Sequence, residues 1–158
     1  NLILLTRCES TSKEKAEFWM NWLKEKAPGI PVIKTHTICE GLFKHSGEFA
    51  NLNKNTNIMA FSAIGRPESF YAQLEQCGFK IAAKKEFRDH HRFLDSELER
   101  LLQEASEKNL YLVCTEKDAI KIKPEMAEKM DLNILRIKSE AVSDRSFLEE
   151  LGLDNTLC

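Results

Sequence analysis

The chain has 158 residues, of which 42% are hydrophobic and 30% charged. It is therefore long enough to bury a substantial core and has the composition of a globular protein. A net charge of −2 excludes the basic footprint of a nucleic-acid binder, so we expect no nucleic-acid partner. No apolar run approaches the length of a transmembrane helix.

The five cysteines are spread along the whole chain, with no CxxC pair among them: Cys8, Cys39, Cys77, Cys114 and Cys158. This dispersal favours reduced, individually packed thiols in a cytosolic compartment over a disulfide framework. The ligand spacing typical of zinc sites is absent, so we expect no metal site of that kind in this chain.

The chain opens at Asn1, without a methionine, and enters an apolar run at residues 2–5 that is typical of a buried strand. A natural N-terminus seldom begins on a central strand. We therefore expect a C-terminal fragment of a larger protein, with part of the active site missing.

A helix is predicted over residues 12–26, where Thr11 and Glu14 stand three apart as in a capping box. One stripe of this helix is apolar and aromatic, and we expect it to pack on the sheet: Phe18, Trp19, Trp22 and Leu23. Residues 30–38 then read as an extended strand. The glycine- and asparagine-rich residues 39–56 predict a hairpin or linker excursion that leaves the sheet and returns.

Strands and helices alternate through the remainder of the chain. Further strands are predicted over residues 58–64, 79–83, 110–114 and 132–137. Helices are expected from Pro67 to before Gly78, from a cap at Asp95, over residues 124–130 and over 146–151, with a polar loop at 139–145. This alternation predicts a single α/β domain over residues 1–158, with a mostly parallel sheet covered by helices on both faces in a Rossmann-like three-layer arrangement.

The first group of candidate functional residues lies in the turn after residues 58–64. Gly65 and Arg66 precede the helix that starts at Pro67. Free N–H groups and the helix dipole favour an anion there, and the arginine guanidinium suits phosphate or carboxylate. The same residues would also make an ordinary tight turn. The phosphate-loop pattern G-x-x-x-x-G-K-[ST] is absent.

The densest titratable cluster is Asp89, His90 and His91. A carboxylate beside an imidazole can fix its tautomer and raise its basicity, which suits a general base or a residue that supports one. Adjacent side chains in an extended loop point in different directions, so we expect only one histidine to face a given site. The alternative is a solvent-facing loop.

A second polar cluster follows the strand at 110–114 and consists of Thr115, Glu116, Lys117 and Asp118. These side chains could contact a nucleotide or steady the Asp89–His90 loop by ion pairing. They could equally form a self-satisfied helix cap.

A metal-dependent phosphoesterase of the DHH superfamily is a further hypothesis, since Asp89, His90 and His91 spell its signature. That family needs additional aspartates around a metal pair and an apolar strand before the motif. Here the preceding residues are charged: Lys84, Lys85, Glu86 and Arg88.

In combination, the candidate segments resemble the C-terminal part of the tetraacyldisaccharide 4'-kinase (lipid A 4'-kinase) family. The resemblance rests on the stretch from Ala60 to Phe70, on Leu74 and Gly78, on Asp89 and His90, and on residues 115–121. It implies a kinase that transfers the ATP γ-phosphate to the 4'-hydroxyl of a lipid A precursor, peripherally at the cytoplasmic face of the inner membrane. ATP and magnesium would be cofactors of the whole enzyme. Its phosphate loop and magnesium ligands would lie in a missing N-terminal half, and the fragment alone would be inactive.

The resemblance also implies residue roles. His90 would align the catalytic aspartate of the missing half, and Asp89 would lie near the nucleotide. Thr115, Glu116, Lys117 and Asp118 would give nucleotide-side or interdomain support. His91 and Arg66 receive no family role, because the family does not always carry those residue types there. The alternative from another class is a stand-alone α/β module that binds an anion or a partner without catalysis.

Overall fold

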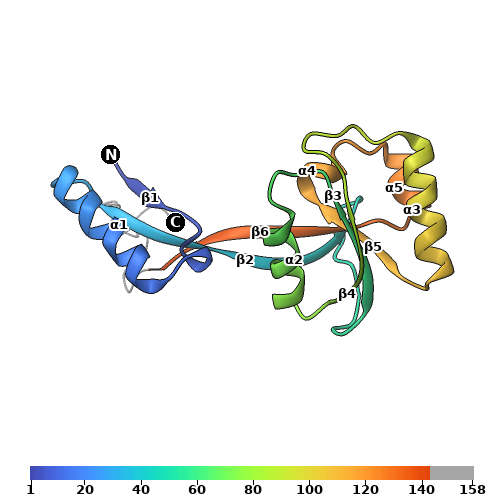
Figure 1. The fold of residues 1–158 in the computed structure, drawn as a ribbon, viewed down its shortest axis with the longest axis horizontal. Helices are drawn as coiled ribbons and strands as arrows, with labels where there is room; N and C mark the ends of the chain where they lie inside the picture. The colour runs from blue at the N-terminus through green and yellow to red at the C-terminus, as the bar shows by residue number, and fades with distance from the viewer. Residues whose placement is uncertain (143–158) are drawn as a thin grey trace. The chain divides into compact units, whose positions relative to one another are not determined.

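The computed structural model describes residues 1–142, which divide into two compact units. Of the described residues, the first unit holds 1–38 and 138–142, and the second holds 39–137. Two long strands, β2 (Val32–Lys44) and β6 (Asn133–Ala141), begin in one unit and end in the other (Figure 1).

The first unit is built from a strand, a helix and the start of β2. The strand β1 (Ile3–Leu5) pairs in parallel with β2, with Ile3 opposite Val32. A 3-10 turn, η1 (Cys8–Ser10), precedes helix α1 (Lys13–Lys26). The hydroxyl of Ser12, rather than of Thr11, caps α1 by accepting a hydrogen bond from the Lys15 N–H at 3.3 Å.

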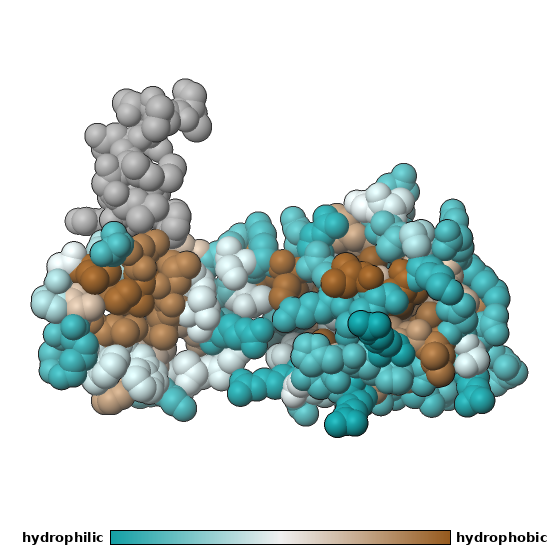
Figure 2. All heavy atoms as spheres, turned by 90° about the horizontal axis from the view of Figure 1, so that it is seen from above, coloured by the Kyte–Doolittle hydropathy of each residue, from teal (hydrophilic) through white to brown (hydrophobic). Residues whose placement is uncertain are grey.

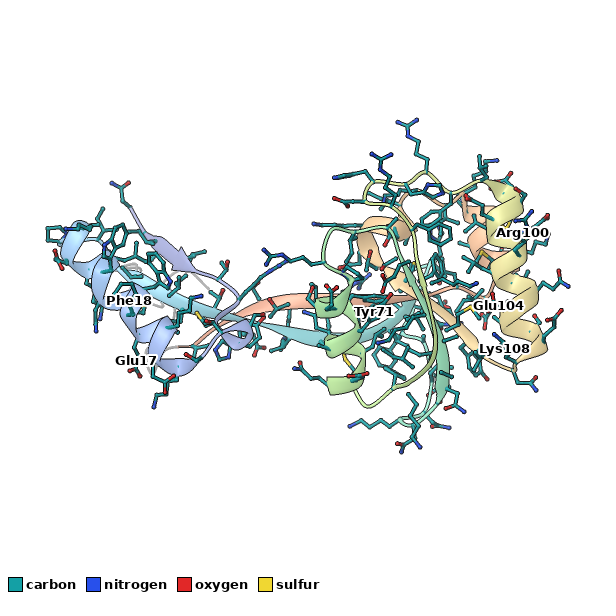
Figure 3. The ribbon with its side chains drawn as sticks, viewed as in Figure 1. Glu17, Phe18, Tyr71, Arg100, Glu104 and Lys108 are labelled. Carbon is teal, nitrogen blue, oxygen red and sulfur yellow. A yellow bond between two sulfur atoms is a disulfide. The ribbon has the colours of Figure 1, made fainter. Side chains whose placement is uncertain are left out.

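The aromatic stripe of α1 differs from its prediction. Phe18 is 60% exposed, and Trp19 and Trp22 are 41% and 42% exposed. Trp19 meets Phe18 on one side and Trp22 on the other, edge to face, with ring centroids 5.5 and 5.6 Å apart. Phe18 is labelled in Figure 3. The predicted packing of the whole stripe on the sheet is therefore incomplete. Leu4 of β1 is also 48% exposed, and Figure 2 shows hydrophobic side chains at the surface of this unit. Helical periodicity identified the stripe but could not identify what covers it.

The second unit contains the remaining elements. Its strands are β3 (Asn57–Ser62), β4 (Lys80–Glu86) and β5 (Tyr111–Thr115), and its helices are α2 (Pro67–Gln76), α3 (Asp95–Glu107), α4 (Glu116–Ala119) and α5 (Pro124–Lys129). The six-stranded sheet has the order β1-β2-β6-β5-β3-β4. The β1–β2, β3–β4, β3–β5 and β5–β6 pairs are parallel. The predicted α/β class with a mostly parallel sheet is confirmed.

Strand β3 separates two hydrophobic cores, because alternate residues of a strand point to opposite faces. Met59 and Phe61 belong to one core, with residues of α3 and α5. Ile58 and Ala60 belong to the other, with residues of α2 that include the labelled Tyr71 (Figure 3). All four of these strand residues are fully buried, which explains the near-continuous apolar run of β3.

The strand predicted over residues 30–38 is longer than expected, because β2 continues to Lys44. The chain then turns, and Phe43 forms an antiparallel bridge with Phe49. Gly41 permits this return: its φ is +142°, and a Cβ there would lie 2.6 Å from the Phe49 ring.

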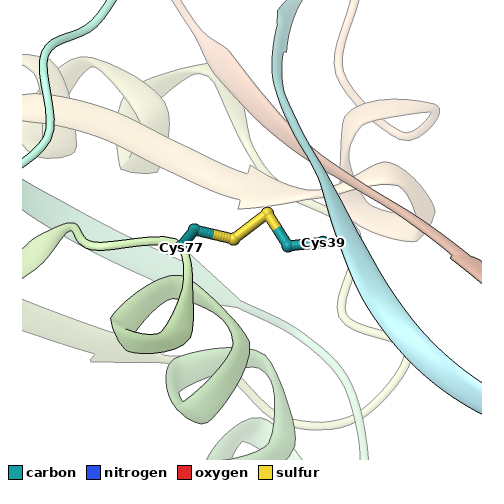
Figure 4. The surroundings of a disulfide bond; sticks show 2 residues. All are labelled: Cys39 and Cys77. Carbon is teal, nitrogen blue, oxygen red and sulfur yellow. A yellow bond between two sulfur atoms is a disulfide. The ribbon is translucent and has the colours of Figure 1, made fainter.

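A disulfide joins Cys39 of β2 to Cys77, the residue that caps the C-terminus of α2 (Figure 4). It corrects the expectation of five reduced, separately packed thiols. The two cysteines are 38 residues apart in sequence, so only the fold reveals that their Cα atoms lie 6.2 Å apart. Cys8 and Cys114 are free and buried.

The chain end differs partly from its prediction. Strand β6 continues to Ala141, through positions expected to form a loop. The helix predicted over residues 146–151 lies outside the described residues. Within residues 1–142, none of the helices has both the length and the apolar character needed to span a membrane.

Candidate functional site

Three chain segments of the second unit meet where the parallel strands β3, β4 and β5 end. They are residues 62–66 after β3, residues 87–91 after β4, and residues 115–121 after β5. Carboxyl ends of parallel strands share one edge of the sheet, which is where open α/β sheets bind ligands. The three groups of residues selected from the sequence are therefore brought together.

The turn after β3 leaves room for another group to come close to its backbone. Arg66 is exposed and is the N-terminal cap residue of α2, with Pro67 as the first helical residue. Gly65 faces the Asp89 carboxylate, and a Cβ on Gly65 would lie 3.2 Å from Asp89 Oδ2. The N-terminus of α2, the Arg66 guanidinium and the lack of a side chain at Gly65 can together accommodate an anion.

His90 lies at the tip of the loop after β4. Its φ is +61°, in the left-handed region, and its N–H donates to the Ala63 carbonyl at 3.2 Å. The imidazole is 90% exposed, and its Nε2 lies 3.7 Å from Asp89 Oδ2. This geometry presents the ring to solvent beside a half-exposed carboxylate, where it can pair with a group from outside the unit.

His91 has a different environment from His90. Its Nε2 lies 2.8 Å from Glu97 Oε2, and its ring stacks on Phe87 at 5.1 Å. Hydrogen bonds from the Leu94 N–H and from His91 lower the pKa of Glu97 below its ordinary value. Glu97 also completes the cap of α3 through Leu94, not through Asp95 as expected. His91 thus fixes the base of the loop while His90 remains available.

Asp118 is fully buried and hydrogen-bonded on both carboxylate oxygens. Its Oδ2 accepts from Thr115 Oγ1 at 2.7 Å and from the Ala63 N–H at 3.1 Å, and its Oδ1 accepts from Lys121 Nζ at 2.8 Å. Thr115 also caps α4 by accepting from the Asp118 N–H at 3.1 Å. The cluster therefore forms the helix cap and contacts the turn after β3.

The other two members of this cluster face outward. Glu116 Oε1 accepts from Arg136 Nε at 3.3 Å, and both side chains are partly exposed. Lys117 is exposed. Lys117 therefore faces solvent, whereas Glu116 is engaged with Arg136.

The sequence analysis missed Lys121 as a member of the site. Its Nζ donates both to Asp118 and, at 3.3 Å, to the Ala63 carbonyl. The spacing from Asp118 to Lys121 is three residues, one helical turn, which is a signal that could have identified the pair.

The described part of the chain is better suited to bind an anion than a metal ion. Residues 1–142 hold no group of three or more His, Cys, Asp or Glu side chains arranged for a metal ion. The exposed donors at the strand ends include Arg66, Lys117, His90 and backbone N–H groups, which suit an anion such as a phosphate group.

Comparisons with known proteins agree over nearly the whole chain. The model of the family described as tetraacyldisaccharide-1-P 4'-kinase matches residues 1–155. The tetraacyldisaccharide 4'-kinase of Paramagnetospirillum magneticum is 34% identical over 66% of this chain. That of Anaeromyxobacter dehalogenans is 28% identical over 94%. The chain spans 30% and 40% of the length of these two relatives.

A solved structure shares the fold. It is the "apo" form LpxK from Aquifex aeolicus in complex with ATP, which matches with a TM-score of 0.55 and 19% identity. The match covers 96% of this chain and 50% of that one.

Proposed function

The chain belongs to the tetraacyldisaccharide-1-P 4'-kinase family, and we propose that it is the C-terminal part of a lipid A 4'-kinase. The whole enzyme would transfer the γ-phosphate of ATP to the 4'-hydroxyl of a tetraacyldisaccharide 1-phosphate. The observation that carries this proposal is the His90 loop, which presents an exposed imidazole beside Asp89 where three parallel strands end.

In this proposal, His90 supports the base that removes the proton of the acceptor hydroxyl. Phosphoryl transfer needs chiefly positioning, electrostatic stabilisation and one placed base. His90 would pair with a catalytic aspartate contributed by the N-terminal half of the enzyme, and Asp89 would orient the imidazole from a distance of 3.7 Å. The 90% exposure of His90 supports this role, because an imidazole already engaged within this unit could not reach a second domain.

The remaining candidates would act on the nucleotide side. Gly65 and Arg66 would bind a phosphate oxygen at the N-terminus of α2. Glu116 and Lys117 would give nucleotide or interdomain support from the surface, and Thr115 with Asp118 would give that support from within. ATP and magnesium would be held mainly by residues outside this chain, since the phosphate-loop pattern is absent from it.

The partners of the domain would be the N-terminal phosphate-loop half and the lipid A precursor at the cytoplasmic face of the inner membrane. The exposed stripe of Phe18, Trp19 and Trp22 in the first unit supports a covering partner, because apolar surface of this kind usually marks an interface. The fragment alone would lack the phosphate loop and would be inactive.

The test is ATP-dependent phosphorylation of a disaccharide lipid A precursor. The full-length gene product should be active, the 158-residue chain should not, and a full-length His90→Ala variant should retain only a small fraction of the wild-type rate. If a well-folded full-length wild type gave no phosphorylated product, the kinase proposal would fail. A stand-alone anion- or partner-binding module would then be the better hypothesis.

A further inference from the structure

Asp118 and Lys121 form an ion pair that capping of α4 does not require. A helix cap needs only the Thr115 hydroxyl, which already accepts from the Asp118 N–H. Asp118 nevertheless brings a carboxylate to a fully buried position, and a buried charge is costly unless it is paired and hydrogen-bonded. Three donors meet its two oxygens, and one of them comes from another segment, the N–H of Ala63.

Ala63 is the point at which this network reaches the His90 loop. Its N–H donates to Asp118 at 3.1 Å, while its carbonyl accepts from Lys121 Nζ at 3.3 Å and from the His90 N–H at 3.2 Å. The ion pair therefore holds both polar groups of one buried residue. The same carbonyl then holds the backbone of His90.

The conformation of His90 depends in part on its hydrogen bond to Ala63. With φ at +61°, His90 occupies a left-handed conformation that residues with a Cβ seldom adopt, and such a conformation persists only where surrounding contacts impose it. The bond to Ala63 is one of these contacts, and the bond from the His91 N–H to the Arg88 carbonyl at 2.9 Å is another. A shift of Ala63 would change the direction in which the exposed imidazole points.

We propose that Asp118 and Lys121 are positioning residues for His90, acting through the peptide groups of Ala63. This inference rests on the proposed function of His90 and adds an internal support to it. Misplacing a reacting group by about 1 Å can cost roughly 10²-fold in rate. A residue that fixes the loop can therefore affect turnover without touching substrate.

The kinetic test uses the full-length enzyme with Lys121→Met, which removes the donor to both Ala63 and Asp118 but keeps an unbranched side chain of similar length. Lys123→Met is the matched control, since Lys123 pairs with Asp95 at 2.8 Å and both side chains of that pair are exposed. We expect Lys121→Met to lower kcat roughly 10- to 100-fold with the KM for ATP unchanged, and Lys121→Arg to retain more activity. Lys123→Met should match the wild type. Equal kcat values for Lys121→Met and Lys123→Met would overturn the proposal.

A double-mutant cycle separates positioning from general stability. In a His90→Ala background, Lys121→Met should cause no further loss of kcat, because the group it positions is gone. A full additional loss in the His90→Ala background would show that Lys121 acts independently of His90.

Hydrogen exchange provides a readout that does not need catalysis. Peptides covering residues 61–66 and 86–92 should exchange faster in Lys121→Met than in Lys123→Met, while peptides from α1, which holds no member of either ion pair, exchange equally in both. If the wild type proved inactive as a kinase, the proposed function would fail, but this local exchange would still decide whether the pair holds the loop. Unchanged exchange in residues 86–92 would refute the positioning role.

Discussion

Substituting Gly65 with alanine displaces the Asp89 carboxylate and also adds a methyl group at the proposed anion site. Gly65 does not have a positive φ, so its backbone conformation accepts an alanine without strain. Among residues 1–142, the atoms nearest to the new Cβ are Asp89 Oδ2 at 3.2 Å and Asp89 Cγ at 3.7 Å. The carboxylate must therefore retreat by a few tenths of an ångström, and it can, because the Asp89 side chain is 50% exposed.

The magnitudes follow from this geometry. Replacing glycine with alanine at a compatible position stabilises a protein by about 0.4–1 kcal/mol, and the small displacement of Asp89 offsets part of that gain. We expect the free energy of unfolding to change by less than about 1 kcal/mol. If a shift of about 1 Å costs roughly 10²-fold, a few tenths of an ångström should lower kcat by roughly three- to tenfold.

Two assays together test this reasoning. Urea unfolding of wild type and Gly65→Ala gives the stability, and initial rates of the full-length enzymes with a disaccharide lipid A precursor give kcat. The control is the same substitution in an Asp89→Ala background, where the new methyl group displaces no carboxylate, so any loss that remains measures its direct effect on the anion site. Unaltered kcat in Gly65→Ala would refute the claim that the Asp89 position matters. A loss of stability much above 1 kcal/mol would refute the geometric argument.

Three further predictions concern separate features. His90→Ala in the full-length enzyme should lower kcat by roughly 10²–10⁴-fold, whereas His91→Ala should chiefly reduce stability; equal kcat losses would contradict the division between the two histidines. Burial raises the pKa of Tyr71 to about 12 from 10.0, so folding favours its neutral form. Stability should therefore fall by about 2–3 kcal/mol as the pH rises from 10 toward 12, and this loss should be smaller in Tyr71→Phe but unchanged in Tyr111→Phe, as followed by urea unfolding. Reducing the Cys39–Cys77 disulfide should expose two further thiols to a thiol reagent and lower stability by about 3–4 kcal/mol, an effect that a Cys39→Ser/Cys77→Ser variant should not show.

The α/β class could be predicted from the sequence because strands and helices are indicated by short local patterns. The run from Ile58 to Phe61 is apolar at every position, as expected of a strand buried on both faces. Pro67 is typical of the first residue of a helix and predicts the start of α2. Element order then requires parallel pairing, which brings the strand ends to one edge. The meeting of Gly65 with Asp89 thus follows from topology and from turns that the sequence itself marks.

Other features depend on distances that sequence does not carry. Cys39 and Cys77 are joined because the middle of β2 passes the end of α2, and nothing in their spacing indicates this. The exposure of Trp19 and Trp22 could not be predicted either, because helical periodicity defines an apolar face without defining its partner. His90 and His91 are identical in type and adjacent in the chain, so their local sequence does not reveal that His91 contacts Glu97 and Phe87 while His90 stays exposed.

Lys121 could be predicted only in part from the sequence, and it indicates how the site is organised. Its spacing from Asp118 could be read from the sequence, but its proposed role depends on a hydrogen bond to a backbone carbonyl 58 residues away. That carbonyl belongs to Ala63, a residue with no side-chain chemistry, which receives the ion pair on one side and the His90 backbone on the other. A search for functional residues by side-chain type therefore overlooks the link between the two polar clusters. Because the link runs through backbone groups, substitutions at Ala63 that preserve its buried volume should be tolerated, while loss of the lysine on the far side should alter the histidine loop.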